Sequence, residues 1–377
     1  MIYLDSAATS FRKPPEVREA VLRAMEECAS PGRGGYPAAN KAAECVFACR
    51  ERCAALFDCR PEQVVFTANA THGLNLAIKG TLSAGDRVVV SGFEHNAVMR
   101  PLYALGARIT VAGTRLFDPE DTLCAFRSAV TPGTKAVICT HVSNVFGYVL
   151  PIEEIAALCR ARGAALIVDA SQSAGCLPVS LQKLGAAYIA MPGHKGLYGP
   201  QGTGVLLCGT VPGRTLIEGG TGSLSEEHGM PQFLPDRLEP GTHNVPGIAG
   251  LSEGIRFVTK TGLSAIQTHG QRLVRYAAKL LSGLPNVRVF AGEPQSGVLS
   301  FLCGADSEET AAYLASCGIA VRAGLHCAPA AHTSAGTLAS GTVRASFSVF
   351  STEADVNALA DALFRFEKNS ESEKETL

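Results

Sequence analysis

Short runs of apolar residues alternate with amphipathic stretches over the first half of the chain. Six runs rich in Val, Ile, Leu and Ala predict β-strands, most of them buried on both faces. These runs lie at 63–67, 87–91, 108–112, 135–141, 164–170 and 204–208. In the intervening stretch 151–163, Pro151 suits a first helical turn and Gly163 suits a helix end. The alternation predicts a mostly parallel sheet with helices on both faces.

The pattern changes in the last third of the chain. A long helical stretch is followed by strand-like runs at 287–290, 297–301, 319–324 and 342–350. We therefore predict a large α/β domain over residues 16–254 and a small α+β domain over 255–366, which also takes in residues 1–15. The end of the chain, 367–377, is charged and nearly free of apolar residues, so it is predicted to be disordered.

Composition and charge exclude several classes of protein. The formal net charge of the 377 residues is −1, and no long basic block precedes the tail, so charge favours neither nucleic acid nor an anionic membrane as a partner. The N-terminus lacks the basic start and apolar core of a signal peptide, and no apolar run approaches the ~20 residues that span a bilayer. We expect a cytoplasmic protein with no membrane or nucleic-acid partner.

The chain has 13 cysteines and no Cys-x-x-Cys pair. Without a secretory signal, this number favours reduced thiols over a disulfide framework. Cys45, Cys49 and Cys53 recur every four residues and would share one face of a helix. Packing into an apolar core and a metal-binding face are the two alternatives, and we predict packing and no metal site.

Polar and titratable residues follow the predicted strands. The segments "TANATHG", "GFEHNAV", "HVSNVFG" and "DASQSAG" come after four of them, and "MPGHKGLYGPQGTG" precedes the last. Ligands of open parallel sheets bind at the carboxyl ends of the strands. We therefore expect these segments to form one binding site.

Lys195 and Asp169 are the most informative residues of these segments. Lys195 is flanked by glycines in a turn whose spacing does not match a phosphate loop. A lysine can form a Schiff base with pyridoxal phosphate, and Asp169 at a strand end could pair with the pyridinium nitrogen. Alternatively, Asp169 is a helix cap and Lys195 a solvated charge. The presence of His95 and Asn144 after neighbouring strands favours the cofactor site.

The segment "RAGLHCAP" (322–329) places an arginine, a histidine and a cysteine within six positions. A buried cysteine is usually a small apolar filler. A cysteine beside a histidine can instead be a nucleophile, and Gly324 and Pro329 suit a loop rather than a core. Cys327 is thus a candidate nucleophile, although His326 need not face the same side as its neighbour.

Seven motifs in order give the chain a resemblance to a known family. They are "IYLDSAATS", "FEHNAV", "HVSNVFG", "VDASQSAG", "GHKGLYGPQGTGVL", "VRAGLHCAP" and "GTVRASF". The sequence resembles the class V, fold-type-I pyridoxal phosphate enzymes of the cysteine desulfurase and selenocysteine lyase family, in the branch with an R-x-G-x-H-C-A loop. The resemblance implies a large domain with a mostly parallel seven-stranded sheet, followed by a small α+β domain.

The resemblance implies a cofactor site. Lys195 would form the Schiff base with pyridoxal 5'-phosphate, and Asp169 would pair with its pyridine nitrogen. The other cofactor-binding positions implied are Gln172 at the ring oxygen, His95 on the ring face, and Ala70, Thr71 and His194 around the phosphate. Thr242 would reach the phosphate of the other subunit, which implies a homodimer with composite sites.

The resemblance also implies a reaction. Asn144 and Arg344 would bind the carboxylate of L-cysteine, with Arg322 as the alternative arginine. Cys327 would attack the substrate sulfur, retain it as a persulfide and release L-alanine, and the sulfur would pass to an acceptor protein or a reductant. The alternatives are a selenocysteine lyase, another class V enzyme, and a non-catalytic sulfur carrier. No G-x-G-x-x-G follows the first strand, which disfavours a nicotinamide dehydrogenase.

Three positions depart from the family pattern. Pro192 and Ala70 stand where many relatives have hydroxyl residues, which removes two potential phosphate donors. Leu325 replaces a histidine that is common in the cysteine loop. The following segment, 331–342, is small, polar and Gly-rich; it is expected to be a mobile lid or acceptor-facing segment, or a plain surface loop.

Overall fold

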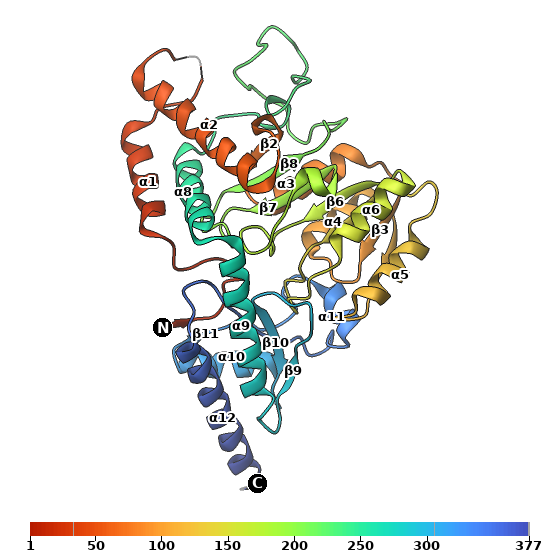
Figure 1. Cartoon of the computed structure of the whole chain (residues 1–377), viewed down its shortest axis with the longest axis vertical. Helices are drawn as coiled ribbons and strands as arrows, with labels where there is room; N and C mark the ends of the chain where they lie inside the picture. Colours follow the sequence, from red (N-terminus) through yellow and green to blue (C-terminus); the bar gives the residue numbers. More distant parts are fainter. Residues whose placement is uncertain (33, 305, 376–377) are drawn as a thin grey trace.

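A seven-stranded sheet forms the centre of the larger part of the molecule (Figure 1). The computed structural model describes residues 1–32, 34–304 and 306–375. The strand order is β2-β8-β7-β6-β5-β3-β4, with β3 to β7 parallel and β8 antiparallel to both of its neighbours. The strands are β2 (Val64–Thr67), β3 (Arg87–Ser91), β4 (Arg108–Ala112), β5 (Ala136–Thr140), β6 (Ala165–Asp169), β7 (Tyr188–Pro192) and β8 (Gly204–Cys208). The predicted mostly parallel seven-stranded sheet is confirmed.

Helices cover both faces of this sheet because its strands are apolar on both sides. In β3, Val88 and Val90 pack into one apolar core with α3 and α4, whereas Val89 packs into the opposite core with α2, α5, α6 and α8. The helices are α1 (Pro15–Glu27), α2 (Pro37–Phe57), α3 (Ala70–Thr81), α4 (Asn96–Leu105), α5 (Pro119–Ala129), α6 (Ile152–Arg162), α7 (Leu181–Leu184) and α8 (Val245–Thr261). Two 3-10 turns, η1 (Pro61–Gln63) and η2 (Asp236–Leu238), complete this part.

Strand β7 was not among the runs picked out from the sequence. All five of its residues are buried, and it lies between β6 and β8. Its apolar run is short and leads directly into the Gly-rich segment that begins at Gly193, so the pattern does not separate it from that segment. Lys195 consequently follows the carboxyl end of a central strand, at the same sheet edge as Asp169.

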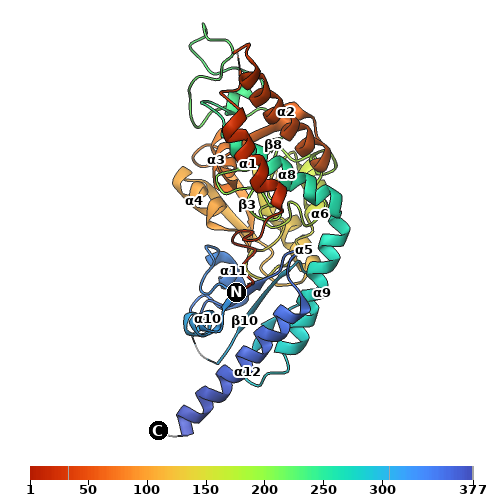
Figure 2. The same ribbon diagram turned by 90° about the vertical axis from the view of Figure 1, so that its left-hand side faces the viewer.

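A second, smaller sheet lies toward the C-terminus (Figure 2). Its order is β12-β10-β9, and it packs against α9, α10 and α12 in an apolar core that also contains Leu4. The elements are β9 (Arg288–Phe290), β10 (Val298–Leu302), β12 (Val343–Ser346), α9 (Leu263–Leu281), α10 (Ser307–Ser316), α11 (Pro329–Ala335) and α12 (Glu353–Glu375). The N-terminal β1 (Ile2–Tyr3) pairs in parallel with β11 (Ile319–Ala320), so the first residues pack with the last third of the chain.

Helix α12 continues to Glu375 and projects from the body of the molecule (Figures 1 and 2). The tail from 367 was expected to be disordered, but its described residues continue the helix. Glu and Lys are favourable helix residues, which explains how a charged segment continues α12, and Glu367 accepts a hydrogen bond from the Asn286 N–H at 3.0 Å. Residues 376–377 lie outside the described part. Among the described residues, no helix is both long enough and apolar enough to cross a membrane.

Candidate active site

A cavity of about 340 Å³ lies where the carboxyl ends of the central strands meet the N-terminal segment and the loop after β11. Parallel strands bring their carboxyl ends to one sheet edge, which is why segments distant in sequence meet here. The cavity brings together all of the site residues predicted from the sequence except Thr242. They are Ala70, Thr71, His95, Asn144, Asp169, Gln172, His194, Lys195, Arg322, Cys327 and Arg344.

Two glycines let the turn that carries Lys195 pack against the turn after β6. A Cβ on Gly175 would lie 2.2 Å from the carbonyl oxygen of Gly196, and a Cβ on Gly196 would lie 2.4 Å from that of Ala174. Larger residues would push the two turns apart. Burial lowers the pKa of Lys195 to about 8, and the positive charge of Arg344 contributes, while Asp169 opposes the shift.

Asp169 ends β6 as a nearly buried carboxylate. Its Oδ1 accepts a hydrogen bond from the Ser171 backbone N–H at 2.9 Å, so it caps the turn that follows. The residues after Asp169 form a turn rather than a helix, so the helix cap given as its alternative role is not found, and the carboxylate lies on the cavity wall. Asp169 also acts at a distance, because its charge opposes the lowering of the pKa of His95 by burial.

The N-terminus of α3 forms another part of the wall. Asn69 caps the helix by accepting a hydrogen bond from the His72 N–H at 2.9 Å. Ala70 and Thr71 follow in the first turn, where backbone N–H groups lack helical partners and the helix dipole is positive. Such a helix end binds anions.

His194 lies between this wall and the N-terminal segment. Its Nδ1 is 3.2 Å from the Thr9 hydroxyl, and its carbonyl oxygen accepts a hydrogen bond from the Ser10 N–H at 2.8 Å. Burial, together with the charges of Lys195 and Lys13, lowers the pKa of His194 to about 4. The ring is therefore neutral at physiological pH.

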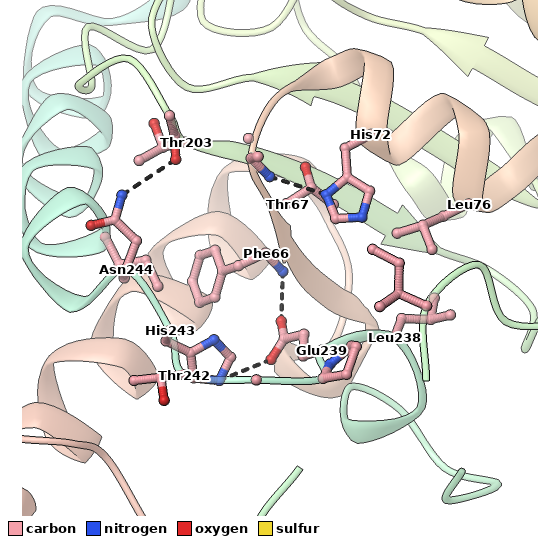
Figure 3. A pocket seen from close by; sticks show the side chains of 17 residues that line it. Phe66, Thr67, His72, Leu76, Thr203, Leu238, Glu239, Thr242, His243 and Asn244 are labelled. Carbon is pink, nitrogen blue, oxygen red and sulfur yellow. Dashed lines mark hydrogen bonds and ion pairs between the residues drawn. The ribbon is translucent and has the colours of Figure 1, made fainter. Parts of the chain in front are cut away.

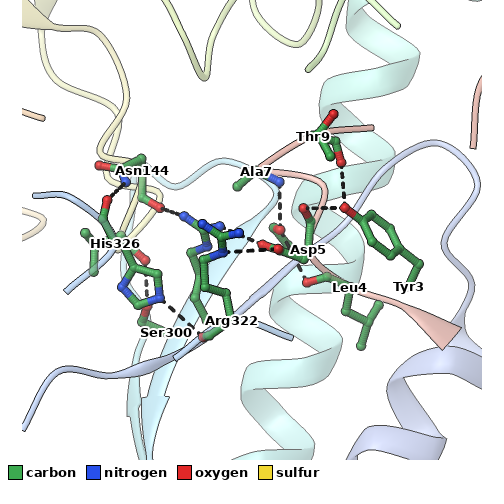
Figure 4. A network of polar contacts seen from close by, with 12 residues as sticks. Tyr3, Leu4, Asp5, Ala7, Thr9, Asn144, Ser300, Arg322 and His326 are labelled. Carbon is green, nitrogen blue, oxygen red and sulfur yellow. Dashed lines mark hydrogen bonds and ion pairs between the residues drawn. The ribbon is translucent and has the colours of Figure 1, made fainter. Parts of the chain in front are cut away.

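The guanidinium of Arg344 is held by Asp5, which follows β1, and by the Asn144 carbonyl. Figure 4 shows Asp5 and Asn144 in this network of polar contacts. Arg344 is 2% exposed; Nη2 donates to Asp5 Oδ1 at 2.7 Å and Nη1 donates to the Asn144 carbonyl at 2.9 Å. Its Nε is buried without a hydrogen-bond partner. Arg322, which is more exposed, donates from Nε to the other oxygen of Asp5 at 3.2 Å. Nε is thus the one nitrogen of the Arg344 guanidinium that has no hydrogen-bond partner among the described residues.

Asp5 was missed from the sequence. Its pairing with Arg344 spans 339 positions, and no local pattern reports such a contact. The side-chain amides of two predicted site residues also donate hydrogen bonds to backbone carbonyls. Asn144 Nδ2 donates to the carbonyl of His326 at 2.8 Å, and Gln172 Nε2 donates to that of Ala7 at 3.0 Å. The N-terminal segment is therefore part of the cavity wall.

Cys327 is an exposed, free thiol on this cavity, so it does not fill an apolar core. Both His326 and Cys327 have left-handed backbone, with φ of 51° and 55°. This conformation costs an L-residue roughly 1–2 kcal/mol. Two hydrogen bonds hold it: Asn144 Nδ2 donates to the carbonyl of His326 at 2.8 Å, and the Asn96 N–H donates to that of Cys327 at 2.7 Å.

Much of the segment after this loop is packed, unlike the lid or surface loop expected over 331–342, whereas residues 338–340 are exposed. Its first part belongs to α11, and His332, Thr337 and Thr342 are buried. The sequence is Gly-rich, but its polar residues are satisfied internally; the His332 Nδ1 lies 2.8 Å from the Thr337 hydroxyl. His326 is also buried, and its ring contacts His332 and the Arg322 carbonyl.

Thr242 lies outside this cavity. It is exposed and lines a second cavity of about 200 Å³ together with His72, Glu239 and His243 (Figure 3). Glu239 accepts a hydrogen bond from the Phe66 N–H at 2.5 Å and pairs with buried Arg50, which fixes the start of the segment that carries Thr242.

Glu94 is a further buried group that was not predicted. It precedes His95, and its Oε1 accepts hydrogen bonds from the Ser91 hydroxyl and, at 2.8 Å, from the Thr140 N–H. Its Oε2 is buried without a partner. Burial raises the pKa of Glu94 to about 8, and the charge of Asp169 adds to the effect. The carboxyl is thus protonated at neutral pH and ties the ends of β3 and β5 together.

Cys49 and Cys53 lie in the apolar core, as packing would require. In the described part of the chain, no three His, Cys, Asp or Glu side chains are grouped so that they could hold a metal ion.

Comparison with known proteins identifies similar chains. A family model described as aminotransferase class V matches residues 2–359. A probable cysteine desulfurase of Methanothermobacter thermautotrophicus is 33% identical over 375 residues, covering 96% of this chain and 94% of the relative. A cysteine desulfurase of Klebsiella pneumoniae is 33% identical over 395 residues, covering 98% of this chain and 94% of the relative.

Solved structures agree with these sequence matches. The apo structure of a cysteine desulfurase from Thermococcus onnurineus NA1 has a TM-score of 0.89 at 30% identity, covering 98% of this chain and 95% of that one. A cysteine desulfurase from Escherichia coli has a TM-score of 0.84 at 28% identity, covering 96% of this chain and 94% of that one. The similarity extends over both sheets.

Glu94→Gln tests the buried carboxyl. The folded-state pKa of Glu94 is raised, so its contribution to stability is complete below about pH 4.5 and is lost as the pH rises through about 8. The variant lacks this titration, so wild type should lose stability relative to it between pH 5.5 and 8.5, by an amount on the order of a few kcal/mol. Urea unfolding at several pH values measures this difference. The exposed control Glu154→Gln should show none, and a constant difference for Glu94→Gln would contradict the assignment.

Proposed function

We propose that this chain, which belongs to the aminotransferase class V family, is a pyridoxal phosphate-dependent cysteine desulfurase. It would convert L-cysteine to L-alanine and accept the sulfur on Cys327 as a persulfide. One observation carries the proposal: an exposed thiol lies on the same cavity as a lysine of lowered pKa and a nearly buried carboxylate. Transamination alone does not need such a thiol.

The residues of the cavity fit pyridoxal phosphate. An aldehyde needs an amine that loses its proton near neutral pH, and the pKa of Lys195, about 8, provides one. The pyridinium nitrogen needs a carboxylate partner, and Asp169 lies on the cavity wall. The phosphate needs an anion-binding site, and the N-terminus of α3, where backbone N–H groups lack helical partners, can provide one. When bound, the cofactor supplies an electron sink for bonds at the substrate Cα.

Side chains around these three groups complete the proposed cofactor site. Gln172 would bind the ring oxygen and His95 would cover the ring face. At the phosphate, Thr71 and His194 would contribute side chains, whereas Ala70 has only its backbone N–H to offer. The neutral ring of His194 can donate one hydrogen bond to the phosphate without adding a charge.

Arg344 and Asn144 would bind the substrate carboxylate. The Arg344 Nε is buried and unpartnered, while its other two nitrogens already donate to Asp5 and to the Asn144 carbonyl. A carboxylate at Nε would satisfy that donor, and the second N–H of Nη2, on the same edge, could share the contact. Near pH 8 about half of the Lys195 amine is neutral, so it can accept a proton from the substrate Cα and return it.

Cys327 would take the sulfur as a thiolate nucleophile. A bond forms between its Sγ and the substrate sulfur while the substrate Cβ–S bond breaks. The electron pair of that bond stays with the substrate carbon, where a proton replaces sulfur and gives alanine. A reductant or an acceptor protein then removes the outer sulfur. His326 does not serve as the base in this proposal, because both of its ring nitrogens contact other groups.

A homodimer would complete the phosphate site. Thr242 is exposed and lies off the cavity of its own chain, as a residue that serves a partner would. In this arrangement Thr242 of one subunit reaches the phosphate bound by Thr71 and His194 of the other.

The cofactor assignment predicts that pyridoxal phosphate added to cofactor-free protein attaches to Lys195. The rate should rise with pH and level off above about 8, because the attacking amine loses its proton there. Growth of visible absorbance follows the rate, and borohydride reduction with peptide mapping identifies the lysine. Lys13 is the internal comparison, since its pKa is also lowered to about 8. A label on Lys13 would contradict the assignment.

Cys327→Ser tests the sulfur step. The variant should keep the cofactor band and its change on adding cysteine, yet lose at least 100-fold in alanine formation, because no thiolate attacks the sulfur. Mass spectrometry of wild type after turnover should find one extra sulfur on the Cys327 peptide. Cys317→Ser changes another exposed cysteine and should retain wild-type activity. Undiminished alanine formation by Cys327→Ser would refute the proposal.

Arg344→Lys tests carboxylate binding. A lysine keeps the charge but lacks the planar fork, and a charge-assisted hydrogen bond contributes roughly 1.5–3 kcal/mol. We expect KM for cysteine to rise about 10- to 100-fold, with the cofactor band unchanged. Arg322→Lys, on the more exposed arginine, should change KM by less than a factor of about three. The reverse order of effects would move the substrate carboxylate to Arg322.

A further inference from the structure

A chain of polar contacts lies behind the loop that carries Cys327. It runs from Thr337 through His332 and His326 to the backbone of Arg322. We propose that His332 is a positioning residue for Cys327. By contacting His326, His332 holds the loop in its left-handed conformation. The proposal rests on the proposed function only in taking Cys327 as the reacting thiol.

The contacts join two buried rings. His326 Nε2 is 3.2 Å from the Arg322 carbonyl oxygen, and His326 Nδ1 is 3.4 Å from His332 Nε2. His332 Nδ1 is 2.8 Å from the Thr337 hydroxyl. The rings lie nearly parallel, 12° apart with centroids separated by 5.7 Å, and His332 also packs against Phe146. All four ring nitrogens therefore have a polar partner.

The chemistry of the partners fixes the direction of every hydrogen bond. A carbonyl oxygen only accepts, so His326 Nε2 carries the hydrogen that it donates to Arg322. A neutral imidazole has one N–H, so His326 Nδ1 accepts from His332 Nε2, and His332 Nδ1 in turn accepts from the Thr337 hydroxyl. Burial keeps both rings neutral, lowering the pKa of His326 to about 3 and that of His332 to about 4. Both histidines are Nε2–H tautomers.

This series of hydrogen bonds affects Cys327 through the backbone of His326. His326 is the first of the two left-handed residues, and its ring is fixed at both nitrogens. Its carbonyl accepts from Asn144, as Figure 4 shows, and the carbonyl of Cys327 accepts from the Asn96 N–H. His332 is the donor to His326 Nδ1. Without it, that buried nitrogen loses the partner that sets the ring, and the backbone of His326 loses one of the constraints that oppose its strain.

The alternative is that His332 only packs α11 against the core. Two substitutions separate the roles. His332→Gln places an N–H donor close to the position of Nε2, whereas His332→Leu has a similar volume and no donor. Thr333→Val is the control, because Thr333 lies on the same helix, is exposed, and its hydroxyl donates to the Pro329 carbonyl at 3.0 Å, away from the histidines.

Hydrogen exchange of the Asn96 amide reports the loop without any turnover. This amide lies on a different element and donates to the carbonyl of Cys327. We expect His332→Leu to speed its exchange at least tenfold, with His332→Gln and Thr333→Val close to wild type. A packing role would speed exchange within α11 in both His332 variants and leave the Asn96 amide unchanged, which would overturn the proposal.

Kinetics supply the second measurement. His332→Leu should lower kcat for alanine formation at least tenfold with KM for cysteine within about twofold, because Arg344 is untouched, and His332→Gln should restore most of kcat. Equal losses in the Leu and Gln variants would overturn the proposal. Nitrogen NMR of the two histidines should show Nε2–H on both rings. An Nδ1–H on either ring would also overturn the proposal. If wild type forms no alanine, the proposed function fails, while exchange and tautomers still decide the role of His332.

Discussion

The buried charge of Arg344 is the constraint around which the site is built. A guanidinium removed from water costs several kcal/mol unless it is paired and hydrogen-bonded. Its partners come from distant segments: Asp5 follows β1, and the Asn144 carbonyl follows β5. Satisfying this one charge therefore brings the N-terminus, the large sheet and the small sheet to the same place. The remaining Nε gives the cavity a fixed donor for an anion.

The other charges of the cavity are adjusted by the same low-dielectric surroundings. Burial raises the pKa of Glu94, with a smaller contribution from the negative charge of Asp169, which also opposes the lowering of the pKa values of Lys195 and His95 by burial. With Glu94 protonated, the buried carboxyl groups that follow β3 and end β6, on either side of β5, do not have to carry negative charge together. Burial and the positive charge of Arg344 likewise lower the pKa of Lys195 and favour its neutral amine. Perturbed pKa values such as that of Lys195 on the cavity wall are typical of functional sites.

Much of the fold was predictable because it depends on local patterns. Continuous apolar runs identify strands buried on both faces, and the polar segments after them identify the binding edge of the sheet. Strand β7 was missed because its apolar run merges with the glycine-rich turn that follows. The packed state of the segment after Cys327 was missed for a related reason: its small polar residues are typical of a loop, and only the buried contact between His332 and Thr337 gives it a fixed structure.

The candidate site was predictable only where chemistry leaves a local trace. A lysine between glycines and a cysteine beside a histidine are unusual neighbours, and both lie on the cavity. Asp5 and Glu94 leave no such trace. Asp5 matters through a contact over 339 positions, and Glu94 through burial that no sequence pattern around it reports. Interactions of this kind depend on the assembled fold, which a pattern read along one chain does not contain.

The state of the cysteine loop also constrains how sulfur would leave the enzyme. Cys327 is exposed, yet its backbone is held by hydrogen bonds from Asn96 and Asn144 and followed at once by α11. A loop fixed on both sides does not carry a persulfide outward by swinging away. If Cys327 accepts sulfur, the acceptor has to approach the thiol at the mouth of the cavity, where Leu325, 38% exposed, stands beside it in the chain. In the proposed reaction, hydrogen bonds that hold the loop would therefore place the requirement for movement on the acceptor.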